Sequence, residues 1–188
     1  MDYFNVEKGN PFNIEKGLSD VTVGLGWNVS EKTDKTMDLD AFAILKKGET
    51  ASDMVYFNNK ESRCGAVRLS GDNLTGKGDG DDEQLWFQLD KLPADVTEVL
   101  VWIVIYNGLK KHQTFEDVEG VHCRLFEGID GINNRPLASF DVGGGNGETR
   151  SMHVATMCKD ETWDFQRVEK GFNFDQAELQ SRYTWKRD

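Results

Sequence analysis

The sequence predicts an all-β protein: a β-sandwich of about eight to ten mostly antiparallel strands, with a short C-terminal helix. Three observations lead to this fold class. Short runs of apolar, β-branched and aromatic residues recur along the 188 residues. Clusters of Gly, Asn, Asp and Pro separate these runs at fairly regular spacing, which is typical of sandwiches and barrels. Helical periodicity, by contrast, is scarce.

The first half of the chain contains four expected strands. Alternation is clearest between residues 84 and 89, because Leu85, Phe87 and Leu89 fall on one face of a strand. An earlier run alternates large residues with small or polar ones, as expected for a half-buried strand. The four expected strands are residues 21–27, 40–45, 54–57 and 84–89.

The second half of the chain contains the most apolar strand, residues 98–106. Both of its faces carry large apolar side chains, which predicts a strand buried on both sides. Four further strands are expected at residues 121–126, 137–142, 151–157 and 163–168.

Two short segments are candidates for helix. One is residues 114–119. The other is the tail, where Asp175 and Glu178 fit a capping box and residues 177–183 continue as a helix. The glycine run at residues 143–147 is interpreted as a flexible turn, because a strand and not a helix follows it.

The organisation is that of one domain spanning residues 1–188, with a helical extension from about residue 173 to 188. No Ser/Pro-rich linker divides the chain, and the 38% of apolar residues supports a packed interior. No apolar run is long enough to span a bilayer, and the first residues lack the pattern of a secretory signal. A cytoplasmic protein is therefore expected. Three widely spaced cysteines without a CxxC motif indicate reduced thiols.

The formal net charge of −11 disfavours nucleic acid as a general partner, because phosphate backbones attract basic proteins. The acid is concentrated in residues 71–83, which hold five carboxylates, four glycines and one lysine. Glycine lets the backbone fold tightly and so brings the carboxylates together. Two such charges about 5 Å apart repel by roughly 3 kcal/mol at an effective dielectric near 20. A cation or solvent must offset that repulsion.

Calcium suits this pattern, since it takes six to eight oxygen ligands in flexible geometry. The segment is not an EF-hand, because Lys77 stands where that loop requires glycine. Asp38 and Asp40 lie two apart at the start of an expected strand and so share a face. Asn58 and Asn59 end another strand and offer neutral oxygens. A solvated loop is the alternative for residues 71–83, and turn or capping roles are the alternatives for the other four.

Several motifs resemble the TerD family of tellurite-resistance and stress proteins. They are residues 21–27 (VTVGLGW), 38–41 (DLDA), 56–59 (YFNN), 71–83 (GDNLTGKGDGDDE) and 92–96 (LPADV), in that order along the chain. The similarity extends from about residue 18 to 171. The tail departs from it, because a helix-like segment continues where other members end in a short glycine-rich stretch.

The resemblance implies a bacterial β-sandwich that binds more than one calcium ion, with two expected, at one edge. It implies a cytoplasmic location, with the inner membrane face as an alternative, and stress-response or membrane-associated proteins as partners. By motif match, the metal-site candidates are Asp38, Asp40, Asn58, Asn59, Asp72, Asn73, Asp81, Asp82 and Glu83.

The predicted function is that of a non-enzymatic calcium-binding module in the response to tellurite and other stress. No catalytic residues and no organic cofactor are predicted. One alternative is a metal-dependent phosphate-ester hydrolase that uses the same carboxylates, although no Ser-His-Asp, Cys-His or HExxH pattern supplies a nucleophile or base. Another is a scaffold whose acidic loops are merely solvated.

Overall fold

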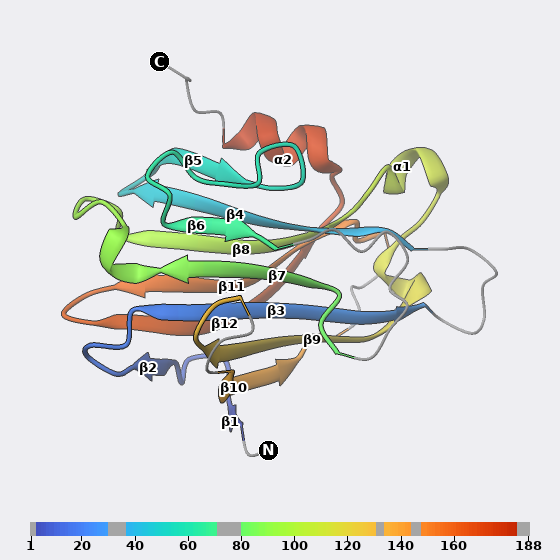
Figure 1. The fold of residues 1–188 in the computed structure, drawn as a ribbon. Coiled ribbons are helices and arrows are strands. Elements are labelled where there is room, and N and C mark those ends of the chain that lie inside the picture. Colours follow the sequence, from blue (N-terminus) through green and yellow to red (C-terminus); the bar gives the residue numbers. More distant parts are fainter. Residues whose placement is uncertain (1–2, 30–36, 71–79, 131–133, 144–147, 184–188) are drawn as a thin grey trace.

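Two six-stranded β-sheets pack face to face in the computed structural model, which describes residues 3–29, 37–70, 80–130, 134–143 and 148–183 (Figure 1). Apart from a parallel pairing of β1 with β10, all strand pairs are antiparallel. The predicted fold class, a mostly antiparallel β-sandwich with a short C-terminal helix, is confirmed.

The first sheet has the strand order β1-β10-β9-β3-β7-β6. Its strands are β1 (Phe4–Asn5), β10 (Arg135–Asp141), β9 (Val118–Glu127), β3 (Asp20–Val29), β7 (Glu83–Gln88) and β6 (Val67–Leu69). Along β3, the large residues of the predicted alternation face the core, while Thr22, Gly24 and Gly26 face outward. Those two glycines later prove important for the site.

The second sheet has the strand order β2-β12-β11-β8-β4-β5. Its strands are β2 (Phe12–Ile14), β12 (Trp163–Phe172), β11 (Ser151–Lys159), β8 (Glu98–Ile105), β4 (Leu39–Lys47) and β5 (Thr50–Val55). β8 is buried on both faces, as predicted. Val101 and Ile103 lie in the core between the sheets, and Leu100, Trp102 and Val104 lie in a second cluster on the outer face.

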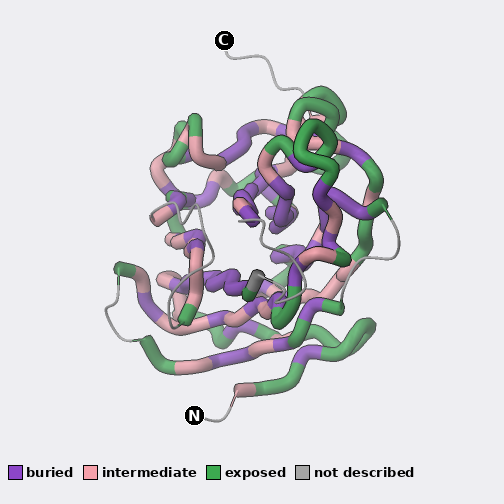
Figure 2. Tube along the Cα trace, turned by 90° about the vertical axis from the view of Figure 1, so that its right-hand side faces the viewer, coloured by how far each residue is buried: buried purple, intermediate pink, exposed green. Residues whose placement is uncertain are grey.

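The short C-terminal helix α2 (Gln176–Arg182) covers that outer cluster (Figure 1). Asp175 is its N-cap, and the Asp175 side chain accepts a hydrogen bond from the Glu178 amide at 3.1 Å. The other helices are η1 (Leu89–Lys91), α1 (Gly108–Lys111) and η2 (Phe115–Asp117). In Figure 2 the buried segments follow the strands around the interior, and the exposed segments lie mostly at turns and ends.

Three sequence predictions need correction. The strand expected at residues 54–57 is β5, which runs from Thr50 to Val55, because Tyr56 and Phe57 enter a tight turn. The helix expected at residues 114–119 is a single 3-10 turn, after which β9 begins. The short strands β1, β2 and β6 were not expected. Part of the glycine run at residues 143–147 lies outside the described residues.

Candidate calcium site at the acidic end

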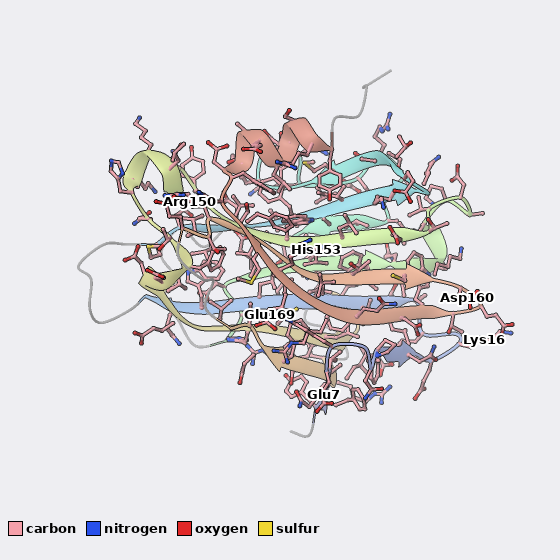
Figure 3. The ribbon with its side chains drawn as sticks, turned by 180° about the vertical axis from the view of Figure 1, so that it is seen from behind. Glu7, Lys16, Arg150, His153, Asp160 and Glu169 are labelled. Carbon is pink, nitrogen blue, oxygen red and sulfur yellow. The ribbon has the colours of Figure 1, made fainter. Side chains whose placement is uncertain are left out.

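Carboxylates carried by both sheets lie at one end of the sandwich, which we call the acidic end: Asp38, Asp40, Asp82 and Glu83. β4 begins beside the first two of them, and β7 begins at Glu83. The end of β8 lies here too, because Leu39 pairs with Ile105 and Ile105 bonds to the carbonyl of Arg150. Figure 3 shows Arg150 at this end and Lys16 and Asp160 at the opposite end.

Two of these acids are almost completely buried. Asp40 is 3% exposed and Glu83 is 2% exposed, while Asp38 and Asp82 are half-buried. Removing a charged carboxylate from water costs several kcal/mol unless another charge or hydrogen bonds compensate. Keeping these two acids ionised would therefore require compensation from another charge or from hydrogen bonds.

Glu83 bridges the two sheets. Its Oε2 accepts a hydrogen bond from the backbone amide of Ala41 in β4 at 2.5 Å. This amide is available because β5 pairs with β4 only from Ala43 onward. The side chain from β7 thus takes the place of a missing strand partner, and it holds the starts of β4 and β7 together.

Asp82 extends the pairing between β3 and β7 by one step. The strand ladder ends where Leu25 pairs with Glu83. Beyond it, the Asp82 amide donates to the Leu25 carbonyl at 2.8 Å, and Asp82 Oδ2 accepts from the Trp27 amide at 2.8 Å. Burial raises the pKa of the Asp82 carboxyl above its ordinary value, although the hydrogen bond from Trp27 opposes this shift.

The turn after β5 carries the two predicted asparagines. Tyr56 and Asn59 exchange backbone hydrogen bonds at 3.0 and 2.8 Å, and Asn59 Nδ2 donates to the carbonyl of Met54 at 2.5 Å. Asn58 is exposed. The Phe57 ring contacts Tyr106 at 5.7 Å between centroids, and the Tyr106 amide donates to the Asp38 carbonyl. The turn is therefore tied to the acidic end through two aromatic rings.

Asp81 points in a different direction from its neighbours. Its Oδ1 lies 2.8 Å from Arg124 Nε, 2.6 Å from Arg124 Nη2 and 3.5 Å from His122 Nε2. His122 and Arg124 alternate along β9 with the core residues Val121, Cys123 and Leu125, so they face outward. The Asp81 side chain is only 4% exposed on this outer face. A hydrogen bond to Asp81 raises the pKa of His122, and burial works against that shift.

Two glycines in β3 make room for Asp81. A Cβ atom at Gly24 would overlap the Asp81 carboxylate, and one at Gly26 would overlap the His122 ring and lie 2.8 Å from the Gly80 carbonyl. The sequence pattern did not single out His122 or Arg124. The available signal was the pair of outward-facing glycines in a strand, which marks a close approach by another segment.

The described residues thus bring Asp38, Asp40, Asp82 and Glu83 to one end, connect Asn58 and Asn59 to it, and turn Asp81 to the outer face. Asp72 and Asn73 lie outside the described residues. Within the described part of the chain, no three His, Cys, Asp or Glu side chains form a group that could hold a metal ion. The chemistry of the predicted donors nevertheless fits calcium, because all of them are carboxylate or amide oxygens.

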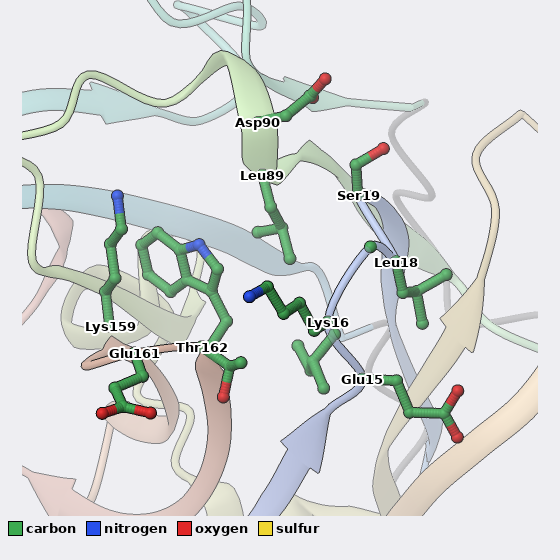
Figure 4. Close-up of a pocket in the computed structure, with 12 residues that line it drawn as sticks. Glu15, Lys16, Leu18, Ser19, Leu89, Asp90, Lys159, Glu161 and Thr162 are labelled. Carbon is green, nitrogen blue, oxygen red and sulfur yellow. The ribbon is translucent and has the colours of Figure 1, made fainter.

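A hollow lies at the end of the molecule opposite the acidic end (Figure 4). It has a volume of about 410 Å³, and Trp163 and Leu89 line it together with charged side chains of both signs, including Lys16, Glu161 and Asp90. Lys159 lies over the Trp163 ring at 5.8 Å. Mixed charges and a wide opening give this hollow no clear ligand preference.

None of the helices in the described residues has the length and apolar character needed to cross a bilayer.

The fold and the acidic end together define a β-sandwich protein in which both sheets contribute buried carboxylates to one end. The chain belongs to the TerD family, because the family model described as TerD domain matches residues 3–183. Tellurium resistance protein TerD of an Alcaligenes species is 30% identical over 187 residues, covering 95% of this chain and 96% of that protein. Stress response protein SCP2 of Bacillus subtilis (strain 168) is 29% identical over 198 residues, covering 95% and 98%.

Solved structures agree with this assignment. A crystal structure of a homologue of the telluride resistance protein TerD, from Streptomyces coelicolor A3(2), superposes with a TM-score of 0.69 at 26% identity. The superposition covers 87% of this chain and 95% of that one. The predicted resemblance to the TerD family is therefore confirmed.

Proposed function

We propose that this chain is a calcium-binding protein of the tellurite-resistance and stress-response type, and that it acts as a non-enzymatic interaction module. Calcium would bind at the acidic end, held by Asp38, Asp40, Asp82 and Glu83. Asp72, Asn73, Asn58 and Asn59 are proposed to complete the oxygen ligands. When bound, the ion would supply the positive charge that offsets the buried carboxylates and would stabilise the folded chain by mass action.

One observation carries this proposal: Asp40 and Glu83 are almost fully buried at the adjacent starts of strands from opposite sheets. Glu83 is fixed by the Ala41 amide, and Asp40 is the residue immediately before Ala41. Two nearly fully buried acids near neighbouring strand starts favour a site for a divalent cation, because a buried carboxylate is costly to keep ionised without a compensating charge. Calcium is favoured over magnesium because it takes six to eight oxygen ligands in flexible geometry, whereas magnesium requires a near-ideal octahedron and retains its waters.

Calorimetric titration tests the proposal. We expect the unaltered chain to bind calcium more tightly than magnesium. Asp40→Asn and Glu83→Gln should each weaken calcium binding by about tenfold or more, because each removes one charge from the site. Glutamine keeps an acceptor oxygen for the Ala41 amide, so the second variant should retain the connection between the sheets.

Asp53→Asn is the matched control. Asp53 is also buried, at 5% exposure, but its oxygens accept from the amides of Met54 and Arg63. We expect this variant to lose stability and to keep its calcium affinity. Equal loss of calcium affinity in all three variants would show a general effect of unfolding, and no binding by the unaltered chain would contradict the proposal.

The proposed biological role rests on the names of the relatives, which are tellurium resistance and stress response proteins. We propose a cytoplasmic protein whose calcium-loaded end contacts other stress-response or membrane-associated proteins. The non-enzymatic part of the proposal is tested with a generic phosphate ester. Turnover that disappears in Glu83→Gln would replace this proposal with the hydrolase alternative.

A further inference from the structure

Residues 80–83 run alongside β3, and successive residues contact different sides of that strand. The Gly80 carbonyl lies against Gly26, and Asp81 lies over Gly24 on the outer face. The Asp82 amide and carboxylate bond to Leu25 and Trp27. Glu83 then pairs with Leu25 and sends its side chain to the other sheet. The carboxylates of Asp81, Asp82 and Glu83 therefore point in three different directions, although the residues are consecutive.

From this arrangement we propose that Asp81 is not a calcium ligand but a latch: its ion pair with Arg124 positions Asp82 and Glu83 at the acidic end. This inference rests on the proposed function, since it assigns a role within the same site. It changes the set of ligands predicted from the sequence, in which Asp81 stood with Asp82 and Glu83.

The contacts of Asp81 and Arg124 support the latch. Arg124 Nε donates to Asp81 Oδ1 at 2.8 Å, Arg124 Nη2 lies 2.6 Å from the same oxygen, and His122 Nε2 lies 3.5 Å from it. The guanidinium also lies over Phe126 at 5.8 Å, so an aromatic face supports it. An ion pair at 4% exposure on the carboxylate side is shielded from salt far better than a surface pair.

The direction of Asp81 argues against a ligand role. Calcium ligands lie about 2.3–2.6 Å from the ion, so oxygens that share an ion must converge. Asp81 lies against the outward-facing glycines of β3, whereas Glu83 reaches inward to Ala41. The Asp81 oxygen that Arg124 and His122 face already has cationic or polar partners on the outer face.

The effect of Arg124 on calcium affinity distinguishes the two roles by its sign. If Asp81 were a ligand, Arg124→Met would free its carboxylate and remove a competing cation, so calcium would bind more tightly. If Asp81 is a latch, the same change releases the chain before Asp82 and weakens binding. We expect a loss of about tenfold, which is typical of residues that orient metal ligands.

The experiment measures calcium dissociation constants by calorimetry for the unaltered chain, Arg124→Met, Asp81→Asn and the double variant. We expect the three variants to weaken binding to a similar extent, because the second change has nothing left to break. Arg135→Met is the matched control: it removes the same charge from an exposed pair with Glu127 in the same sheet, and binding should stay within about twofold of the parent. Unchanged or tighter binding by Arg124→Met would overturn the latch.

A second measurement does not depend on calcium. In EDTA, the urea midpoints of Gly24→Ala and Asp81→Ala should show strong coupling, because the new methyl group occupies the space that the shortened side chain vacates. Additive shifts in the midpoint would overturn the placement of Asp81. If the unaltered chain bound no calcium, the proposed function would fail, while this cycle would still decide whether Asp81 is held over Gly24.

Discussion

At the scale of single residues, His153 shows how the outer face of the second sheet affects a titratable group. Its ring is parallel to that of Trp102, with 4.9 Å between centroids and 9° between planes, and its Nε2 lies 2.9 Å from Thr156 Oγ1. Figure 3 shows it on the strand layer beneath the C-terminal helix. Burial lowers the pKa of His153 from 6.5 to about 4. Glu98 opposes this shift, and Lys46 and Lys170 add to it.

This lowered pKa predicts a loss of stability in mild acid. Between pH 6.5 and 4 the unfolded chain binds a proton at this histidine that the folded chain does not, so the free energy of unfolding decreases as the pH falls. The expected slope is at most about 1.4 kcal/mol per pH unit. Urea unfolding at pH 7 and pH 5 measures it. His153→Gln should lose about 2 kcal/mol less than the parent over this interval, and equal losses would contradict the assignment.

The acidic residues of the proposed site stand out in the sequence, but the direction of each side chain does not. Asp38 and Asp40 lie at the start of β4, as the strand pattern predicted, and their role as calcium ligands stays a prediction. Asp81 was grouped with Asp82 and Glu83 because the motif at residues 71–83 resembles that of the TerD family. Its partner Arg124 is 43 residues away in sequence, and no local pattern connects them. Only the pairing of β3 with both β7 and β9 brings them together.

At the scale of elements, helix α2 acts as a cover for apolar side chains on the outer face of the second sheet. Leu179 is fully buried, and Phe174 is 7% exposed. Both belong to the cluster around Phe42, Leu100 and Trp102. Without this helix, β8 and β4 would present that cluster to solvent.

Leu179→Ala should therefore lower the free energy of unfolding by about 2–5 kcal/mol, the range for truncating a buried leucine. Urea unfolding followed by tryptophan fluorescence measures the loss, since Trp102 lies in the same cluster. Ser181→Ala, at an exposed position of the same helix, is the control and should change stability by less than about 0.5 kcal/mol. A small effect of Leu179→Ala would show that the helix contributes little.

Element prediction succeeded where the pattern was long and failed where the elements were short. The doubly apolar run became β8, and the N-cap at Asp175 correctly marked the start of the tail helix. The strands β1, β2 and β6 have two or three residues, too few to show a period. Tyr56 and Phe57 have strong strand propensity, but they belong to the turn that includes Asn58 and Asn59 and not to β5.

At the scale of the whole molecule, the proposed calcium binding would be linked to stability, because an ion that binds only the folded chain stabilises it. If the acidic end binds calcium, the ion stabilises the folded state by RT ln(1 + [Ca]/Kd), which is about 2.7 kcal/mol at a hundredfold excess over the dissociation constant. We expect the melting temperature to rise on addition of calcium and to fall in EDTA. Magnesium at the same concentration is the control and should have a smaller effect. Identical melting curves in calcium and EDTA would contradict the proposal.

A cluster around Arg167 connects β12 of the second sheet to β10 and to the segment after β1 in the first sheet. Its Nη2 donates to the Asp141 carbonyl at 3.0 Å and to Glu169 at 2.8 Å, and its Nη1 donates to the Val6 carbonyl at 3.4 Å. Burial opposes ionisation of Glu169, but hydrogen bonds from Gly143 and Arg167 hold the pKa of Glu169 below its ordinary value. Figure 3 shows Glu169 close to the junction of the two sheets.

Arg167→Met should destabilise the chain by roughly 1–3 kcal/mol, because several acceptors lose a charged donor at once. Denaturant unfolding measures this loss. Arg182→Met is the matched control, since it removes an exposed i,i+4 pair with Glu178 and should cost less than about 1 kcal/mol. Similar losses in the two variants would show that Arg167 does not join the sheets.

Three of the four outermost strands are short: β1 has two residues, and β6 and β2 have three each, whereas β5, with six, is of ordinary length. An edge strand exposes unpaired backbone N–H and C=O groups, and the risk that another chain pairs with them increases with the length of the strand. Short edge strands of this kind leave few unpaired backbone groups with which a strand of another molecule could form hydrogen bonds. A cell could accumulate this protein in large amounts with little risk of its copies joining into continuous sheets.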